Sequence, residues 1–141
     1  MTAKEYLSQI RQMRARLQVL QDEIATIRSQ AESVRGMDYD KVRVQSSPDM
    51  DPLATYLGRL TEAEEELSTE LEQYLTVYTQ IFRQIANLGM GIYADVLYLR
   101  YFDGLSLSEI ADQLGYSYDY TRHIHGVALQ EFEHKYLDST R

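Results

Sequence analysis

The side chains best suited to contact another molecule lie near the C-terminus, at Ser117, Tyr118, Asp119, Arg122 and His123. Arg122 can donate hydrogen bonds to a guanine base or to phosphate, and the hydroxyl groups of Ser117 and Tyr118 can donate to phosphate. At about 100° per residue, Asp119, Arg122 and His123 fall on one face of a helix, with Tyr118 at its flank. These residue types on one exposed face predict a DNA-binding site.

Two helix starts are expected to position these side chains. Ser106 followed by Glu109 forms a capping box, in which each side chain accepts a hydrogen bond from a free backbone N–H of the first turn. This helix should end at Gly115, because glycine adopts the left-handed conformation at least cost. Ser117 can cap a second helix, with Asp119 in its first turn complementing the helix dipole. A short helix, a glycine turn and a second helix outline a helix-turn-helix; the alternative is a helical hairpin used only for packing.

Each of these short helices also carries an apolar face. The first helix places three apolar residues on one side, Ile110, Ala111 and Leu114. The second helix is expected to turn four residues inward, Thr121, Ile124, Ala128 and Phe132. The two faces should therefore pack against each other and leave the opposite face of the second helix in solvent.

A family resemblance is carried by residues 98–117, Tyr-Leu-Arg-Tyr-Phe-Asp-Gly-Leu-Ser-Leu-Ser-Glu-Ile-Ala-Asp-Gln-Leu-Gly-Tyr-Ser, and by residues 122–129, Arg-His-Ile-His-Gly-Val-Ala-Leu. This part looks like the fourth-region helix-turn-helix of sigma factors. It is also similar to the C-terminal part of small phage and prophage proteins of Gram-positive bacteria. In those proteins a long helical region and a Val-Gln-Ser-Pro-like loop, here residues 44–48, precede the sigma-like domain. The resemblance implies transcriptional control or another phage DNA transaction, with double-stranded DNA and RNA polymerase as partners.

The charge of the chain departs from that of an ordinary DNA-binding protein. Sigma factors carry several basic residues where this chain has Tyr118, Asp119 and Tyr120, which leaves only Arg122. The net charge is −8, and residues 90–141 hold 4 basic and 8 acidic residues. Such a balance argues against strong non-specific binding to nucleic acid. If the protein binds DNA, its affinity must come from shape, dimerisation or a partner more than from bulk charge.

Two long helices are predicted before this module. The first has apolar residues at alternating steps of three and four, at Ala3, Tyr6, Ile10, Met13, Leu17, Leu20, Ile24, Ile27, Ala31 and Val34. The second starts with Asp51 as a capping acid and Pro52 at the first helical position. Its heptad series is broken once, by Glu64, in Leu53, Leu57, Leu60, Glu64, Leu67, Leu71, Tyr74, Tyr78, Ile81, Ile85 and Leu88. The loop at residues 36–50 either contacts DNA or a partner protein or simply connects the helices.

These patterns predict an all-α protein with two regions. Residues 1–89 should form a long antiparallel helical hairpin resembling a coiled coil, and residues 90–141 the helix-turn-helix module. Regular heptads also favour a homodimer or a higher homo-oligomer through residues 3–34 and 53–88. Sequence alone leaves open whether the hairpin satisfies itself or pairs with a second chain. A small terminase-like packaging subunit and a protein adaptor that binds polymerase without DNA are the alternative functions.

Other kinds of chemistry find little support. The 141 residues contain no cysteine, no phosphate-binding glycine loop and no nucleophile elbow, so we expect no enzymatic activity and no cofactor. Glu131 and His134 give a single Glu-x-x-His step, and His123 and His125 would lie about 200° apart on a helix, so we expect no metal site. The N-terminus lacks the apolar segment of a signal peptide, and no apolar run approaches the roughly 20 residues of a membrane helix. We therefore expect a cytoplasmic protein that does not bind membranes.

Overall fold

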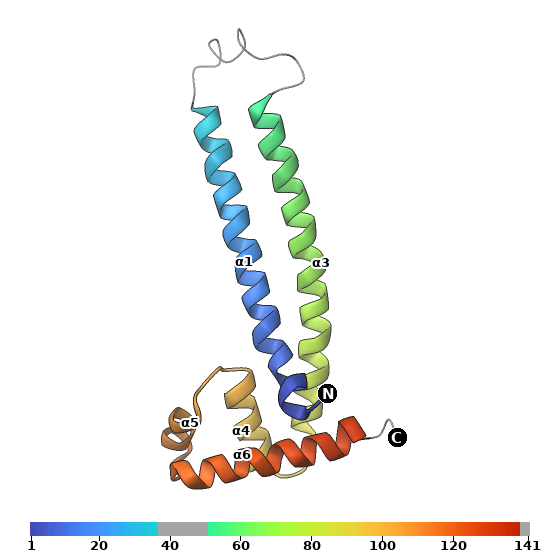
Figure 1. The fold of residues 1–141 in the computed structure, drawn as a ribbon, viewed down its shortest axis with the longest axis vertical. Helices are drawn as coiled ribbons and strands as arrows, with labels where there is room; N and C mark the ends of the chain where they lie inside the picture. Colours follow the sequence, from blue (N-terminus) through green and yellow to red (C-terminus); the bar gives the residue numbers. More distant parts are fainter. Residues whose placement is uncertain (37–50, 139–141) are drawn as a thin grey trace. The chain divides into compact units, whose positions relative to one another are not determined.

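The computed structural model describes residues 1–36 and 51–138, and every regular element in these ranges is helical (Figure 1). The elements are α1 (Ala3–Arg35), α3 (Pro52–Ala86), α4 (Gly91–Tyr101), α5 (Leu107–Leu114), α6 (Tyr118–Phe132) and a terminal π-helical turn, η1 (Glu133–Leu137). The predicted all-α fold is confirmed. None of the described helices combines the length and the apolar character needed to cross a bilayer. The predicted loop contact falls on residues 37–50, which lie outside the described residues.

The chain packs as two compact units. Unit 1 comprises residues 1–14 and 74–141, and unit 2 comprises residues 15–73. This division differs from the predicted regions 1–89 and 90–141. The reason is that the first turns of α1 and the last turns of α3 share a hydrophobic core with the C-terminal helices.

Unit 2 is an antiparallel pair of helices, formed by the parts of α1 and α3 that lie side by side in Figure 1. Its core joins Ile24 and Ile27 of α1 to Leu60, Ala63 and Leu67 of α3. The predicted helix start is also confirmed, because the Asp51 carboxylate accepts a hydrogen bond of 3.0 Å from the Leu53 backbone N–H. The heptad series predicted for α1 matches the buried side of that helix throughout.

The seam of α3 in unit 2 differs by one residue from the predicted series at every second position, whereas Leu53, Leu60 and Leu67 face inward as predicted. The predicted series included Leu57 and Leu71 and treated Glu64 as its one break, but Leu57 is 40 % exposed and Leu71 is also exposed. Ala63, which the series left out, is 5 % exposed. The inward positions are held instead by Tyr56, Ala63 and Glu70. With these residues the steps of three and four continue without a break, so Glu64 does not interrupt the core. The prediction was wrong at these positions because leucine is usually a core residue. Leu57 and Leu71 were therefore preferred over Ala63 and Glu70.

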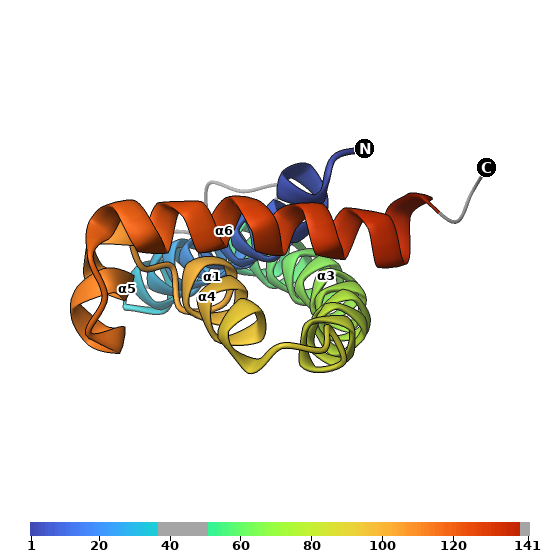
Figure 2. The ribbon, with the colours of Figure 1, turned by 90° about the horizontal axis from the view of Figure 1, so that it is seen from below.

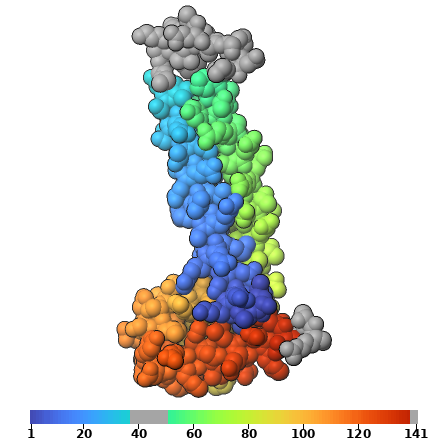
Figure 3. All heavy atoms as spheres, viewed as in Figure 1, coloured from blue at the N-terminus to red at the C-terminus, as the bar shows by residue number. Residues whose placement is uncertain are grey.

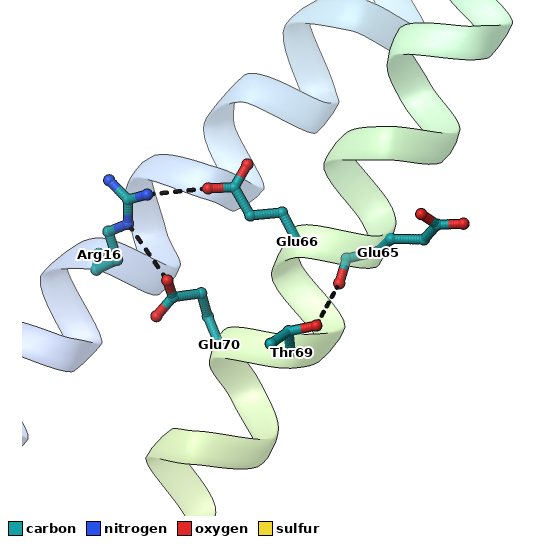
Figure 4. A network of polar contacts seen from close by, with 5 residues as sticks. All are labelled: Arg16, Glu65, Glu66, Thr69 and Glu70. Atoms are coloured by element: carbon teal, nitrogen blue, oxygen red, sulfur yellow. Dashed lines mark hydrogen bonds and ion pairs between the residues drawn. The ribbon is translucent and has the colours of Figure 1, made fainter.

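Ion pairs flank the seam of unit 2. Arg16 contacts the carboxylates of Glu66 at 2.9 Å and Glu70 at 3.9 Å (Figure 4). Arg28 contacts the carboxylate of Glu64 at 2.9 Å. These side chains are substantially exposed to solvent, and exposed pairs contribute only about 0–1 kcal/mol each. They still require Glu64 to lie outside the core, which agrees with the observed register of α3.

Unit 1 is built around a core to which four helices contribute. From the long helices come Leu7, Ile10, Ile81 and Ile85, and from α4 and α6 come Leu97, Tyr101, Ala128 and Phe132. Leu88 and Phe102, which lie just after the ends of α3 and α4, complete this core. The last turns of α3 therefore pack against more than one helix. At the edge of this core, the Arg14 guanidinium donates hydrogen bonds to the Tyr74 hydroxyl, at 2.7 Å, and to the Phe102 carbonyl. Arg14 thereby links α1 to α3 and to the end of α4.

The N-terminus of α1 is held in unit 1 by side-chain caps. The Thr2 backbone N–H donates to the Glu5 carboxylate at 2.9 Å, and the Glu5 N–H donates back to the Thr2 hydroxyl at 3.2 Å. The hydrogen bond from the Thr2 backbone N–H to the Glu5 carboxylate lowers the pKa of Glu5. The next N–H, that of Ala3, donates to the carboxylate of Glu133 at 3.1 Å. The first turn of α1 is thereby joined to the end of α6.

The register of unit 2 predicts unequal costs for two alanine substitutions. Ile27→Ala should lower the free energy of unfolding by about 2–5 kcal/mol, because Ile27 is buried between the helices. Leu57→Ala should change it by less than about 0.5–1 kcal/mol, because Leu57 is exposed. Chemical denaturation followed by circular dichroism measures both values. Equal costs would support the register expected from the sequence instead.

Candidate nucleic-acid interface

The first short helix, α5, begins and ends as the sequence predicts. The Ser106 hydroxyl accepts from the Glu109 N–H at 3.1 Å, and the Ser106 N–H donates to the Glu109 carboxylate at 3.3 Å, so the capping box is complete. At its other end Gly115 has φ 76° and ψ 29°, in the left-handed region. A residue with a Cβ would be strained at this position. The turn between α5 and α6 therefore depends on glycine.

The second short helix, α6, also starts at its predicted cap. The Ser117 hydroxyl accepts a hydrogen bond of 3.1 Å from the Tyr120 N–H, and Asp119 lies in the first turn of the helix. Figure 2 shows α6 crossing over α4, with α5 beside its N-terminal end. The N-terminal turn of α6 is thus held by its own cap and by the glycine turn that precedes it.

The inner faces of the two short helices are buried as predicted. On α6 the buried residues are Thr121, Ile124, Ala128 and Phe132. On α5 Ile110 and Ala111 are buried, and Leu114 is half-buried. One cluster joins Ile110 and Ile124 to Val96 and Leu99 of α4. Because this face is fixed in the core, the opposite face of α6 must point into solvent.

The predicted contact residues all lie at the surface of unit 1: Ser117, Tyr118, Asp119, Arg122 and His123 are exposed. Asp119, Arg122 and His123 line a shallow hollow of about 540 Å³ on α6, with Gly126, Val127 and Gln130. Ser117 and Tyr118 lie at the start of the helix and do not line that hollow. The surface of α5 and α6 appears in orange to red in Figure 3. The structure therefore groups three of these residues and places the other two at the adjoining helix end.

Two aromatic residues at the same end were not among the predicted contacts. Tyr116 and Tyr120 are exposed, and their rings meet edge to face with centroids 5.1 Å apart. Together with Tyr118 they place a tyrosine at every second position across the Ser117 cap. That spacing is a signal the sequence does contain. The structure adds that Tyr116 and Tyr120 are in contact and that all three rings are exposed.

His125, by contrast, faces inward. Its Nε2 atom lies 2.9 Å from the Tyr101 hydroxyl, and the two rings stack with centroids 5.8 Å apart. Burial lowers the pKa of His125 to about 4, and the positive charges of Arg100 and Lys4 act in the same direction. Burial also raises the pKa of Tyr101. The pair therefore joins α6 to α4 as a hydrogen bond between two neutral groups at pH 7.

Thr121 is the buried polar residue of α6. It is 1 % exposed, and its hydroxyl has no hydrogen-bond partner within the described part of the chain. A buried hydroxyl without a partner costs about 1–3 kcal/mol in proteins. The buried side chain therefore contributes to the fold by occupying space and not through a hydrogen bond of its hydroxyl.

The capped α5, the left-handed Gly115 and the capped α6 with a buried inner face define a helix-turn-helix. A family model, Sigma-70 region 4, matches residues 94–131, which run from α4 to the end of α6. The C-terminal module is therefore a sigma region-four-like helix-turn-helix, a DNA-binding class of fold. Comparisons with curated proteins and with solved structures give no match. Over residues 1–36 and 51–138, no three His, Asp or Glu side chains are grouped to hold a metal ion.

The lowered pKa of His125 predicts a loss of stability in mild acid. In the folded chain this group binds a proton only near pH 4, whereas in the unfolded chain it does so near its ordinary pKa of 6.5. The unfolded state therefore binds more protons between these values, and the free energy of unfolding should fall as pH decreases from about 6.5 to 4. Unfolding curves across this window should show a smaller pH dependence in His125→Phe. The exposed His123→Phe is the control and should keep the pH dependence of the unchanged chain.

The unpaired hydroxyl of Thr121 predicts that a less polar residue improves the fold. Thr121→Val keeps the shape and removes the hydroxyl, so it should raise the free energy of unfolding by about 1 kcal/mol. Thr121→Ser keeps the hydroxyl and loses the methyl group, so this substitution should lower the free energy of unfolding. Thermal and urea unfolding of the matched pair measure both changes. A destabilised valine variant would mean that the hydroxyl has a hydrogen-bond partner after all.

Proposed function

We propose that this protein is a non-catalytic, DNA-binding regulator of transcription, of the phage or prophage type. The single observation that carries the proposal is the capped helix-turn-helix within residues 94–131, with the contact residues exposed on α6. In this class the second helix enters the major groove and its N-terminal residues meet the edges of the bases. The start of α6 is the end that the fold leaves free for such a contact.

The exposed side chains suit different parts of a duplex. Arg122 can donate two hydrogen bonds to guanine or bind a phosphate, and Asp119 can accept from the amino group of cytosine. Tyr118 and Ser117, at the start of the helix, can donate their hydroxyl protons to phosphate oxygens. His123 lies next to Arg122 on the outer face and can form a hydrogen bond to a base or to the backbone.

The acidic charge of the chain limits how this binding can work. Residues 90–141 hold 4 basic and 8 acidic residues, so a single module gains little from attraction to the DNA backbone. Two copies on one duplex would combine two weak contacts into a stronger one. We therefore propose a homodimer or a higher homo-oligomer formed through residues 3–34 and 53–88. Its two α6 helices would bind half-sites about one helical turn of DNA apart.

A second candidate is a protein adaptor that binds a partner such as RNA polymerase without DNA. An apolar groove of about 500 Å³ in unit 1 favours it. Phe82 and Ile85 of α3, Ala94 and Tyr98 of α4 and Leu114 of α5 contribute to its lining. The acidic surface of the module would then keep it away from nucleic acid. The two candidates differ in whether the chain binds DNA at low salt.

Arg122 gives the direct test of DNA binding. Duplexes selected from genomic fragments by the full chain should bind Arg122→Ala about 1–3 kcal/mol more weakly at fixed salt, if Arg122 contacts a base. Fluorescence anisotropy measures the affinity. Arg35→Ala is the matched control, because it removes the same charge from an exposed residue of unit 2 that lies outside the proposed oligomer interface. Equal loss in both variants would assign the effect to net charge.

Selection itself separates the two candidates. Recovery of specific duplexes at low salt supports the DNA-binding regulator. Recovery of polymerase subunits with no enrichment of DNA supports the adaptor and removes Arg122 from any DNA site.

A further inference from the structure

We propose that Tyr116, Tyr118 and Tyr120 form an apolar reading surface for the methyl groups of thymine in the major groove. This inference rests on the proposed DNA-binding function and names the kind of site that α6 prefers. The three side chains are 43 %, 49 % and 45 % exposed, respectively. Large aromatic rings left this open at one helix end are suited to bury their surface against a partner.

The position of the rings favours DNA bases as that partner. Tyr118 is the first residue of α6, Tyr120 follows two residues later, and Tyr116 lies just before the Ser117 cap. In a helix-turn-helix, the N-terminal residues of the second helix are those that meet the edges of the bases. The three rings therefore lie at the part of the module that would contact the base edges in the major groove.

The charges around the rings do not favour phosphate as their main target. Within α5 and α6, Arg122 is the one lysine or arginine, whereas Glu109, Asp112 and Asp119 are exposed carboxylates. Carboxylates repel the phosphate backbone, so the binding free energy of this face has to come mainly from contacts with bases. Uncharged rings bring apolar area to such contacts without adding to the repulsion.

Thymine carries the one apolar group that the four bases display in the major groove, its C5-methyl. A tyrosine ring can bury that methyl group, whereas the other base edges offer hydrogen-bond donors and acceptors that a ring face leaves unpaired. The edge-to-face contact of Tyr116 with Tyr120, at 5.1 Å, holds both rings in place before binding. Less side-chain freedom is then lost when the complex forms. The preferred duplex should carry thymines where the first turn of α6 enters the groove.

Deoxyuridine tests the inference, because it pairs as thymine does and lacks only the methyl group. The full chain and a duplex selected by it are used, with each thymine replaced in turn by deoxyuridine. Replacement at a contacted position should weaken binding about fourfold, the factor that corresponds to about 0.8 kcal/mol for one buried methyl-sized group. Thymines outside the contact should be replaceable without effect.

Two variants of one residue assign the effect to the ring. Tyr118→Ala should bind thymine and deoxyuridine duplexes equally at the position that Tyr118 contacts. Tyr118→Phe keeps the ring and loses the hydroxyl, so it should keep the fourfold preference. Circular dichroism melting of each variant checks that the chain remains folded; Tyr118 is exposed, so its replacement leaves the core intact.

The outcomes separate this inference from the proposed function. Specific duplex binding that is unchanged by deoxyuridine at every position overturns the thymine-reading surface and leaves the DNA-binding function standing. A selected DNA site that has no thymine in the segment contacted by α6 would also overturn the thymine-reading surface and leave the DNA-binding function standing. Failure to bind any duplex at low salt overturns the proposed function, and the inference with it.

Discussion

The position of α6 depends on the burial of its inner face in the core of unit 1. Ala128 and Phe132 are fully enclosed there, among residues contributed by both long helices and by α4. The ring of Phe132 also meets those of Tyr6 and Tyr136, at 5.7 Å and 4.9 Å between centroids. Because these contacts fix the rotation of α6 about its axis, they decide which residues reach solvent. The buried residues of α6 therefore determine which of its residues are exposed.

The polar contacts of the module refine this arrangement without replacing it. The Ser106 and Ser117 caps fix where α5 and α6 begin, and the glycine between them sets the turn. The Tyr101–His125 hydrogen bond adds a second link between α4 and α6. Each such contact is worth about 1 kcal/mol, whereas a large buried side chain contributes several times more. Packing therefore provides most of the free energy that fixes the position of α6. The capping side chains determine the residues at which α5 and α6 begin.

Local signals explain why the C-terminal module could be predicted from the sequence. Three such signals act over only a few helical turns: the Ser106–Glu109 capping box, Gly115 and the spacing of buried residues from Thr121 to Phe132. Each depends only on residues that are close together in the chain, so each can be recognised without knowing the rest of the fold. The seam of α3 in unit 2 could not be fixed in this way. Whether Leu57 or Tyr56 faces inward depends on the partner helix, and the pairing of Arg28 with Glu64 appears only once the two helices meet. The hydrogen-bond partner of His125 likewise could not be predicted, because Tyr101 lies 24 residues earlier in the chain.

The hydrogen bond from Ala3 to Glu133 joins groups 130 residues apart in the chain. On the ribosome, the N-terminal turns of α1 are made well before their neighbours in the core, which come from the end of α3, from α4 and from α6. Contacts between such distant parts form late, since the loop that they close costs more entropy than a local turn does. Unit 2 lies within a shorter stretch, residues 15–73, and its helices can meet while synthesis continues. Translation order thus allows the helices of unit 2 to pack before the core of unit 1 is complete.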